Sequence, residues 1–344
     1  MRAVAYRTCL PVEDPQCLID VELPDPVAHG SDLLVEVRAV AVNPVDTKVR
    51  RNLPPPSGGL RVPGWDAAGV VRAVGSDVTR FRPGDRVMYA GALDRPGSNA
   101  ELQLVDERLV GPMPKSLGFT AAAALPLTML TAWELLFDRL QVVPGPNTQG
   151  VLLVTGAAGG VGSALLQLAR QLTGLTVVGT ASRQETRDWA IDMGAHHVVD
   201  HAEQRSGRTL VDQVRALGIG QVEYIASLTH TDIHFPALAE LVAPQGRLAL
   251  IDDPAALDIR LLKRKSASLH WEFMFTRSLF NTPDVGRQGE ILSKVAQQVD
   301  AGQLRSTMNL HYGAICAADL RRAHAEMERH RACGKIVLDH SVHE

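Results

Sequence analysis

The 344-residue sequence predicts an α/β protein with two domains, one rich in β-strands and one built on a doubly wound parallel sheet. Two observations predict this class. Up to about residue 110 the chain consists of short alternating or β-branched runs, such as DLLVEVRAVAV at 32–42, separated by Pro, Gly and Asp. From about residue 120, apolar runs of strand length alternate with helical patterns. Strands with little polar alternation, each followed by a helix, are typical of a parallel sheet covered on both faces.

The expected elements of the second domain follow one another in regular order. Its first strand is VLLVT at 151–155, and apolar residues three and four positions apart then predict a helix over 161–172. Three further pairs of strand and helix are expected at 175–181 and 186–193, 196–200 and 210–217, and 222–228 and 236–242, before strands at 247–252 and 268–275. Beyond them the pattern predicts helices near 291–299 and 320–327 and a strand at 335–338, and we expect this tail to fold back onto the first domain.

Composition argues against several classes of function. The net charge of -3 and the isoelectric point near 6.5, without any basic run, give no footprint for nucleic acid. No apolar run reaches the roughly 18 residues that a membrane helix needs, and the first residues do not form a signal peptide. The four cysteines lie far apart without a C-x-x-C pair, which indicates free thiols in a reducing compartment. We therefore expect a cytoplasmic protein with a small-molecule partner.

The most specific chemical motif is VLLVTGAAGGVGSALLQLA, which begins at Val151. It has the order strand, glycine-rich turn, helix, with Ala157, Gly159 and Gly162 at the three positions of the G-x-G-x-x-G pattern. Glycines let the backbone approach a pyrophosphate, and N–H groups at the start of the helix receive its negative charge. The alternative is a tight turn with a structural role only. We assign dinucleotide binding to this turn, that is, to Gly156, Ala157, Gly159, Gly160, Val161 and Gly162.

The second strand of this domain indicates which dinucleotide is bound. A carboxylate about 20 residues beyond the glycines would hold the ribose 2′-hydroxyl of NAD. At that place the chain has Ala181, followed by Ser182, Arg183 and, one turn later, Arg187. A hydroxyl and a guanidinium accept a 2′-phosphate through charge-assisted hydrogen bonds, which favours NADPH. The alternative is that one or both arginines are solvated surface charges.

Motifs along the whole chain carry a family resemblance. They are AVNPVDTKVR at 41–50, VPGWDAAGVV at 62–71, FRPGDRV at 81–87, LPLTMLTAWE at 125–134, TGAAGGVGS at 155–163 and GKIVL at 334–338. Together they resemble the medium-chain dehydrogenase/reductase superfamily, and within it the zinc-free quinone oxidoreductase branch, in a group often labelled zinc-type alcohol dehydrogenase-like.

This resemblance implies a GroES-like β-barrel domain with an inserted Rossmann domain, the doubly wound parallel sheet expected above. The GroES-like domain would comprise 1–128 plus 284–344, and the Rossmann domain 129–283, with the active site in the cleft between them. Relatives pair the last Rossmann strands of two subunits into one sheet. The apolar run SLHWEFMF at 268–275 therefore predicts a homodimer, whereas an acid–base pair of His270 and Glu272 is the alternative role for this strand.

The same resemblance implies that both zinc sites of the metal-using branch are missing. Asn43 stands where a ligand cysteine would be, and Trp65 stands where a ligand histidine would be. The region of the third ligand holds Leu127 and Thr128, and the interval from Tyr89 to Ala100 lacks the cysteines of a structural zinc lobe. The histidine pairs 196–197 and 230/234 lie on a strand end and a loop, where we do not expect the three or four convergent ligands of a metal site. We therefore expect no metal.

A reductase without zinc must stabilise negative charge on its substrate with fixed hydrogen-bond donors. Asn43 is the first candidate and Thr131 the second, followed by the Trp65 indole and the Lys48 ammonium, while Asp46 would orient a neighbour or a water. Trp65 could equally be plain packing, and Lys48 a solvated surface charge. The resemblance also implies cofactor contacts from Asn43, Pro44, Thr131, His201, Ser227, Phe273 and Lys335.

These inferences predict an NADPH-dependent reductase that transfers hydride to a quinone, enone or aldehyde substrate. Two alternatives stay open. One is a zinc-type alcohol dehydrogenase, against which the missing ligands count. The other is a non-catalytic NADPH-binding protein that senses redox state or has a structural role.

Overall fold

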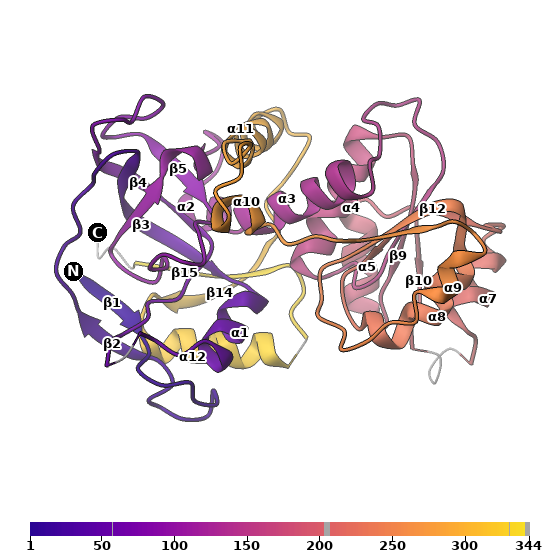
Figure 1. Ribbon diagram of the computed structural model, residues 1–344, viewed down its shortest axis with the longest axis horizontal. Coiled ribbons are helices and arrows are strands. Elements are labelled where there is room, and N and C mark those ends of the chain that lie inside the picture. Colours follow the sequence, from indigo (N-terminus) through magenta and orange to yellow (C-terminus); the bar gives the residue numbers. More distant parts are fainter. Residues whose placement is uncertain (57, 203–206, 330, 341–344) are drawn as a thin grey trace. The chain divides into compact units, whose positions relative to one another are not determined.

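The computed structural model describes residues 1–56, 58–202, 207–329 and 331–340 (Figure 1). The chain divides into two compact units. Unit 1 comprises Met1–Leu130 and Phe275–Glu344, and unit 2 comprises Thr131–Met274. The second boundary lies at Phe275 rather than at 284, because Phe275 is buried and packs edge-on against Trp65 of unit 1 with ring centroids 6.5 Å apart.

Unit 1 is built on a seven-stranded sheet in the order β14-β15-β3-β4-β5-β7, with β6 paired to β3, and on a separate two-stranded sheet β1-β2. The long strand β3 alternates half-buried and buried residues along its first half, as the sequence pattern predicts. The C-terminal strand β15 pairs antiparallel with β3, so the tail completes the sheet formed by the N-terminal part. The strands are β1 (Arg2–Ala5), β2 (Ile19–Glu22), β3 (Asp32–Val42), β4 (Ala67–Val74), β5 (Arg86–Tyr89), β6 (Leu102–Asp106), β7 (Gly111–Pro112), β14 (Met308–Ala314) and β15 (Lys335–Asp339).

Helices connect and cover the sheet of unit 1 (Figure 1). The helix α1 is held at its C-terminal end, where the Tyr6 hydroxyl lies 2.7 Å from the carbonyl oxygen of Leu53 and the buried Arg50 forms an ion pair with Glu328 of α12. The helices are α1 (Pro44–Asn52), η1 (Glu107–Leu109), α2 (Phe119–Ala123), α3 (Pro126–Trp133), α10 (Thr276–Leu279), α11 (Arg287–Asp300) and α12 (Ala317–Glu328). The helix α3 runs across the boundary into unit 2 and continues there as the π-helix η2 (Glu134–Arg139).

The helical segment Phe119–Arg139 differs from the sequence expectation. It is long and apolar enough to cross a membrane by length and composition alone, although no such run was expected. The segment consists of α2, α3 and η2, and Thr120, Pro126 and Glu134 interrupt its apolar residues in the sequence. Of its most apolar window, 83% is buried inside the protein, which is typical of a core helix.

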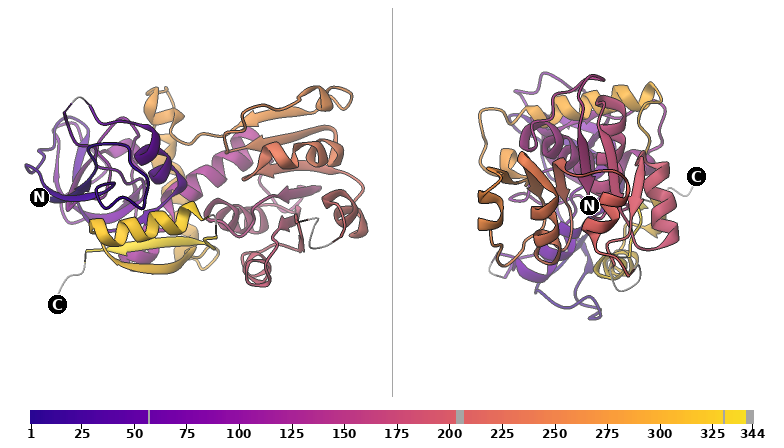
Figure 2. Two further views of the ribbon diagram at one scale, coloured as in Figure 1. Left: turned by 90° about the horizontal axis from the view of Figure 1, so that it is seen from below. Right: turned by 90° about the vertical axis from the view of Figure 1, so that its right-hand side faces the viewer.

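Unit 2 contains a six-stranded parallel sheet in the order β10-β9-β8-β11-β12-β13, with helices on both faces (Figure 2). The strand order changes direction at β8. Strands β9 and β10 follow on one side of β8, and β11, β12 and β13 follow on the other, as in a doubly wound fold. The strands are β8 (Val151–Val154), β9 (Thr176–Thr180), β10 (His197–Val199), β11 (Val222–Ser227), β12 (Val242–Leu250) and β13 (Ser268–Trp271). The helices are α4 (Gly160–Leu172), α5 (Gln184–Asp192), α7 (Leu210–Ala216), α8 (Thr231–Leu241) and α9 (Arg260–Lys263).

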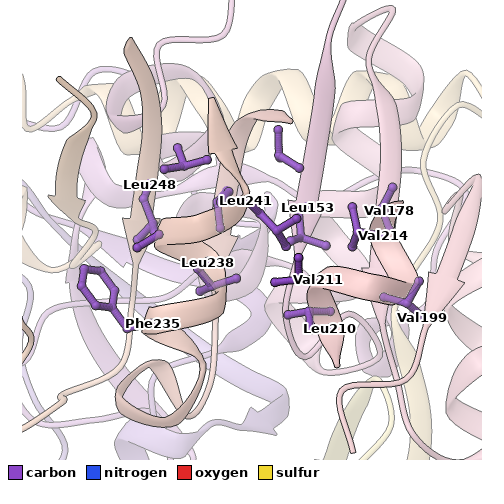
Figure 3. Packing of buried hydrophobic residues seen from close by; sticks show 14 of the residues in the cluster. Leu153, Val178, Val199, Leu210, Val211, Val214, Phe235, Leu238, Leu241 and Leu248 are labelled. Atoms are coloured by element: carbon purple, nitrogen blue, oxygen red, sulfur yellow. The ribbon is translucent and has the colours of Figure 1, made fainter. Parts of the chain in front are cut away.

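One face of this sheet packs against α7 and α8. Figure 3 shows Leu210 and Val211 of α7 and Phe235 and Leu238 of α8 against strand residues such as Leu153. All five side chains are buried, and complete burial of one such side chain contributes roughly 1.5–3 kcal/mol. This cluster fixes the strands whose carboxyl ends carry the candidate cofactor site.

Two elements of unit 2 depart from their expected limits. The helix expected at 236–242 begins at Thr231, because the carboxylate of Asp252 accepts a hydrogen bond from the Thr231 N–H at 2.8 Å and caps the helix five residues before Pro236. The strand expected at 268–275 ends at Trp271, and Met274 and Phe275 are buried outside it.

Candidate active site

Four buried polar side chains of unit 1 form a connected group, the Asp66 cluster, which consists of Asn43, Asp46, Asp66 and Lys335. Each is at most 2% exposed. The Lys335 ammonium donates to the carbonyl of Val42 at 3.0 Å, to Asp66 Oδ2 at 2.9 Å and to Asn43 Oδ1. An ammonium has three N–H donors, so these three acceptors satisfy it. The cluster is therefore internally paired.

The fold brings these residues together from distant parts of the sequence. Asn43 follows β3 and precedes α1, where Pro44 fits the first helical position. Lys335 opens β15, and the pairing of Ile336 with Val42 in β3 places it beside Asn43. Asp66 comes just before β4. Its Oδ1 also accepts the N–H of Leu127 at 2.8 Å, which connects the cluster to the start of α3.

The charges of the cluster do not balance when both carboxyl groups are ionised, since one ammonium faces two of them. Burial raises the pKa of Asp46 to about 7, although its Oδ2 accepts the Asn43 backbone N–H at 2.6 Å. Burial also raises the pKa of Asp66, against the opposing effect of the Lys335 ammonium. Burial therefore favours the neutral form of both carboxyl groups, and for Asp46 the change of charge falls near neutral pH.

The structure shows where the donors predicted from the sequence are directed. The Asn43 amide nitrogen lies within hydrogen-bond distance of Ala41 O (3.2 Å), Trp65 O (3.0 Å) and Asp66 Oδ2 (2.9 Å). The Trp65 indole donates to Ala92 O at 3.1 Å, and its ring is buried. Both groups therefore donate to protein acceptors, and their role toward a substrate stays a prediction.

The other residues proposed near the substrate are more dispersed. Lys48 is exposed on α1, and Pro44 before it is also exposed. Thr131 is buried at the first position of unit 2. Lys335, expected at the cofactor, lies inside the Asp66 cluster, and its cofactor role likewise stays a prediction.

The residues at the expected zinc positions do not fit a zinc ion. The amide of Asn43 and the indole of Trp65 are poor zinc ligands, and both already hydrogen-bond to the protein. Leu127 contributes its backbone N–H to Asp66, and the Thr128 hydroxyl donates to the carbonyl of Leu125 at 3.2 Å. Within the described parts of the chain, no group of three or more His, Cys, Asp or Glu side chains could hold a metal ion.

In unit 2 the glycine-rich turn joins β8 to α4. Gly156 has a φ of 65°, which favours glycine, and a Cβ on Gly162 would lie 2.5 Å from the carbonyl oxygen of Ala157. Gly159 is different, because a Cβ there would meet only one atom, Gly156 O, at 3.5 Å. The protein itself would accept a side chain at Gly159, so this glycine keeps space open in front of the turn.

The same turn leaves the start of α4 available to an anion. Gly159 is the N-cap of α4 and provides no side-chain cap. The first N–H groups of a helix have no partner inside it and attract negative charge. Gly160, Val161 and Gly162 form this first turn, and the arrangement fits the pyrophosphate of a dinucleotide.

The carboxyl end of β9 lies beside the turn, since the Thr180 hydroxyl accepts the Gly156 N–H at 3.2 Å. Ala181 is buried there, and Ser182 and Arg183 after it are partly exposed. Arg187 points its guanidinium at two backbone carbonyls, Ala181 O at 3.4 Å and Val198 O at 3.0 Å. Arg187 is thus engaged with the protein.

Four more side chains lie at this edge of the sheet. The sequence predicted His201 and Ser227 as cofactor contacts, but not Thr180 and Thr231. His201 Nδ1 lies 3.2 Å from the Thr180 hydroxyl, and its ring contacts that of His234 with centroids 5.7 Å apart. The buried Ser227 ends β11 and shares a hydrogen bond of 2.7 Å with Thr231, whose backbone N–H donates to Asp252 just after β12. Sequence reasoning missed Thr180 and Thr231, and the available signal was that Thr180 ends a strand and Thr231 follows the end of another within four residues.

The edge strand β13 carries the remaining candidates. Glu272 just after it is buried and forms an ion pair with Arg139 at 2.8 Å, whereas His270 contacts Ser268 at 3.0 Å. The two side chains therefore have separate partners. Trp271 and Phe273 are 56% and 47% exposed, so the edge presents apolar surface, and the predicted homodimer stays a prediction.

Comparisons with known proteins agree with this fold. Residues 29–122 match the alcohol dehydrogenase GroES-like domain, and residues 193–338 match the zinc-binding dehydrogenase domain. The chain is 36% identical over 345 residues to a zinc-type alcohol dehydrogenase-like protein of Staphylococcus aureus (strain MSSA476), covering 98% of this chain and all of that one. It is 37% identical over 185 residues to the quinone oxidoreductase of Mus musculus, covering 54% and 53%.

Solved structures extend the comparison. A Rhizobium etli CFN 42 protein, provisionally described as a zinc-dependent alcohol dehydrogenase, is 53% identical with a TM-score of 0.94, and 98% of each chain is covered. A mycobacterial protein in complex with NADPH is 28% identical with a TM-score of 0.81, covering 98% of this chain and 99% of that one. With the glycine turn, the GroES-like sheet and relatives that match along their full length, this chain belongs to the medium-chain dehydrogenase/reductase superfamily and has its pyridine-nucleotide-binding oxidoreductase fold.

Proposed function

We propose that the protein is an NADPH-dependent reductase that transfers hydride to a quinone or an α,β-unsaturated carbonyl without a catalytic zinc. The observation that carries the proposal is the end of β9, where Ala181, Ser182 and Arg183 bring a hydroxyl and a guanidinium, and no carboxylate, to the glycine turn. The mycobacterial relative with bound NADPH and the quinone oxidoreductase relatives support the same assignment.

The chain's own groups bind the cofactor in this proposal. When bound, the nicotinamide supplies the hydride. The N–H groups at the start of α4 receive the pyrophosphate over Gly159, and Ser182 and Arg183 receive the 2′-phosphate. The Thr180 hydroxyl holds the turn by accepting the Gly156 N–H.

Reduction of a conjugated carbonyl builds negative charge on its oxygen, and fixed donors must stabilise that charge where no metal does. Asn43 was the first candidate from the sequence, but its amide N–H groups lie against protein acceptors. Thr131, the second candidate from the sequence, is buried at the first position of unit 2, and we propose its hydroxyl as the first alternative donor to Asn43. Lys48, exposed on α1, is the proposed second.

A zinc-type alcohol dehydrogenase is the second candidate, and the names of the full-length relatives favour it. The side chains at positions 43, 65, 127 and 128 oppose it, because none of Asn, Trp, Leu and Thr is a usual zinc ligand. A protein that binds NADPH without turnover is the alternative from another class, and the experiment below separates it from both enzymes.

The test is a panel of quinones, enones and aldehydes, followed by the loss of the reduced-nicotinamide absorbance on chelator-dialysed protein. NADPH consumption with quinones or enones, unchanged by the chelator, supports the proposal. Binding of NADPH without consumption by any acceptor would favour the sensor. Alcohol oxidation that needs added zinc would favour the dehydrogenase.

A further inference from the structure

Unit 1 carries a surface pocket of about 590 Å³ that none of the predicted site residues lines. The turn between β4 and β5, the start of β5, β7 and α11 form its walls. Its volume falls within the range of about 300–1,000 Å³ that is typical of small-molecule sites. Three of its lining residues, Arg80, Arg86 and Lys115, are exposed cations.

Neutral groups hold the Arg80 guanidinium. Its two terminal nitrogens donate to the carbonyl oxygens of Glu107 at 2.9 Å and Val110 at 3.4 Å. Its central carbon lies 5.3 Å from the ring centroid of Phe81, which also lines the pocket. Carbonyls and ring faces orient a guanidinium without cancelling its charge.

Arg86 is held in the same manner. Its Nη2 donates to the carbonyl of Leu117 at 3.0 Å, and its guanidinium lies over the ring of Phe119 at 4.7 Å. A guanidinium has five N–H donors, and this bond uses one of them. Two planar cations are thus fixed in direction beside one pocket, each with donors left for a ligand.

The nearby carboxylates already have partners. Asp85, the one acidic lining residue, accepts the Arg82 backbone N–H at 2.9 Å and lies 3.7 Å from the Arg82 side chain. The Glu107 carboxylate accepts backbone N–H groups of residues 79 and 80. Within the described residues, neither Arg80, Arg86 nor Lys115 forms an ion pair. The three cations and one carboxylate give the lining itself a net charge of +2, and just outside it Asp300 accepts the backbone N–H groups of Lys115 and Ser116 at 3.1 and 2.9 Å.

We propose that this pocket binds a phosphorylated small molecule. A guanidinium fork matches two phosphate oxygens at once, and a second guanidinium with an ammonium suits a ligand that carries more than one negative charge. Phe81 and the buried Met113 supply apolar wall for the remainder of the ligand. This site goes beyond the proposed function, because its residues lie outside the glycine turn and outside the proposed acceptor donors.

The experiment is a calorimetric titration with inorganic pyrophosphate, on protein that holds one equivalent of NADPH so that the glycine turn is occupied. The variants are Arg86→Gln and Lys115→Gln. The matched control is Arg82→Gln, which removes an exposed arginine from the same turn but outside the lining. We expect one pyrophosphate per chain with a millimolar or tighter Kd, weakened about tenfold or more in either variant and less than about twofold in the control.

Lys115→Gln keeps the test decisive if Arg86→Gln unfolds the segment near Leu117, because the Lys115 side chain is exposed. Citrate, titrated in parallel, distinguishes a phosphate from a carboxylate ligand. Absence of pyrophosphate binding, equal binding by wild type and Lys115→Gln, equal weakening in Arg82→Gln, or tighter binding of citrate would each overturn the proposal. NADPH affinity and acceptor turnover should be unchanged in all three variants, so failure here is separable from failure of the proposed function.

Discussion

Two buried groups of unit 1 should make stability depend on pH in opposite directions. His324 on α12 is fully buried beside Arg50, and neither ring nitrogen has a hydrogen-bond partner among the described residues. Burial and, as the smaller cause, the Arg50 charge together lower its pKa from 6.5 to about 3. Asp46 in the Asp66 cluster behaves oppositely, with burial raising its pKa from 3.8 to about 7.

The sign of each contribution follows from which state binds more protons. Between pH 3 and 6.5 the unfolded chain protonates His324 and the folded one does not, so stability is lost as pH falls through this window. Between pH 3.8 and 7 the folded chain protonates Asp46 and the unfolded one does not, so stability is lost as pH rises. At about 1.4 kcal/mol per unit of pKa, the full effects are about 5 kcal/mol for His324 and about 4 kcal/mol for Asp46. Between pH 3.8 and 6.5, where the two windows overlap, the two changes of stability with pH nearly cancel.

Single variants should reveal how each group alone changes the free energy of unfolding with pH. His324→Leu removes the contribution of the histidine. As the pH rises from 4 to 6.5, the free energy of unfolding of this variant, relative to that of wild type, should therefore fall by about 1.4 kcal/mol per pH unit. Asp46→Asn keeps an acceptor for the Asn43 N–H and should show the opposite trend. His29→Leu, which changes an exposed histidine of the same unit, is the matched control and should run nearly parallel to wild type.

The assay must report on unit 1 itself, because a chain of two units need not unfold in one step. Hydrogen exchange of peptides from α1 and α12, measured over this pH range with denaturant, gives the free energy of opening for the two helices. Variant and wild-type values that differ by a constant, independent of pH, would refute the reasoning for that residue.

The remaining predictions concern cofactor, metal, cluster and assembly. Arg183→Ala should weaken NADPH binding about tenfold or more and leave NADH binding unchanged, as measured by fluorescence titration, since one charge-assisted contact contributes roughly 1.5–3 kcal/mol; an equal loss for both cofactors would contradict it. Purified protein should contain well under one zinc per chain by elemental analysis, and stoichiometric zinc that survives dialysis would be the contrary finding. Lys335→Met should lower the free energy of unfolding by about 3–5 kcal/mol because Asp66 is left buried without its cation, and the additional change Asp66→Asn should recover part of that loss in denaturant unfolding. Sedimentation should show a dimer through β13, and a stable monomer at micromolar concentration would exclude it.

Much of unit 2 was predictable because its signals are local. Uninterrupted apolar runs such as 151–155, separated by helical periodicity, predict parallel strands, and the glycine pattern between the first strand and its helix marks the turn from β8 to α4. The limits of α8 and β13 were not predictable in the same way. The start of α8 depends on a cap from Asp252, which lies 21 positions beyond Thr231 in the sequence.

The Asp66 cluster shows why the candidate site was harder to predict than the fold. From the sequence, Asn43 is a polar group at a position where metal-using relatives place a ligand, and a role toward the substrate is the natural hypothesis. The register of β15 against β3 places the Lys335 ammonium at the amide oxygen of Asn43. The amide nitrogen of Asn43 in turn donates to Asp66. A sequence pattern cannot show this pairing, because the partners lie 269 positions apart.

The cluster also separates two tasks that one metal ion can combine. A metal ion can tie distant segments together and can stabilise charge on a substrate oxygen. Here hydrogen bonds to Asp66 join the end of β3, the start of α3 and the start of β15, so the first task is met without a metal. The Asn43 amide and the Lys335 ammonium already donate to acceptors within the protein, so their part in the second task stays a prediction. Replacing Asn43 should therefore act on stability at least as strongly as on turnover, whereas replacing a donor outside the cluster should act on turnover alone.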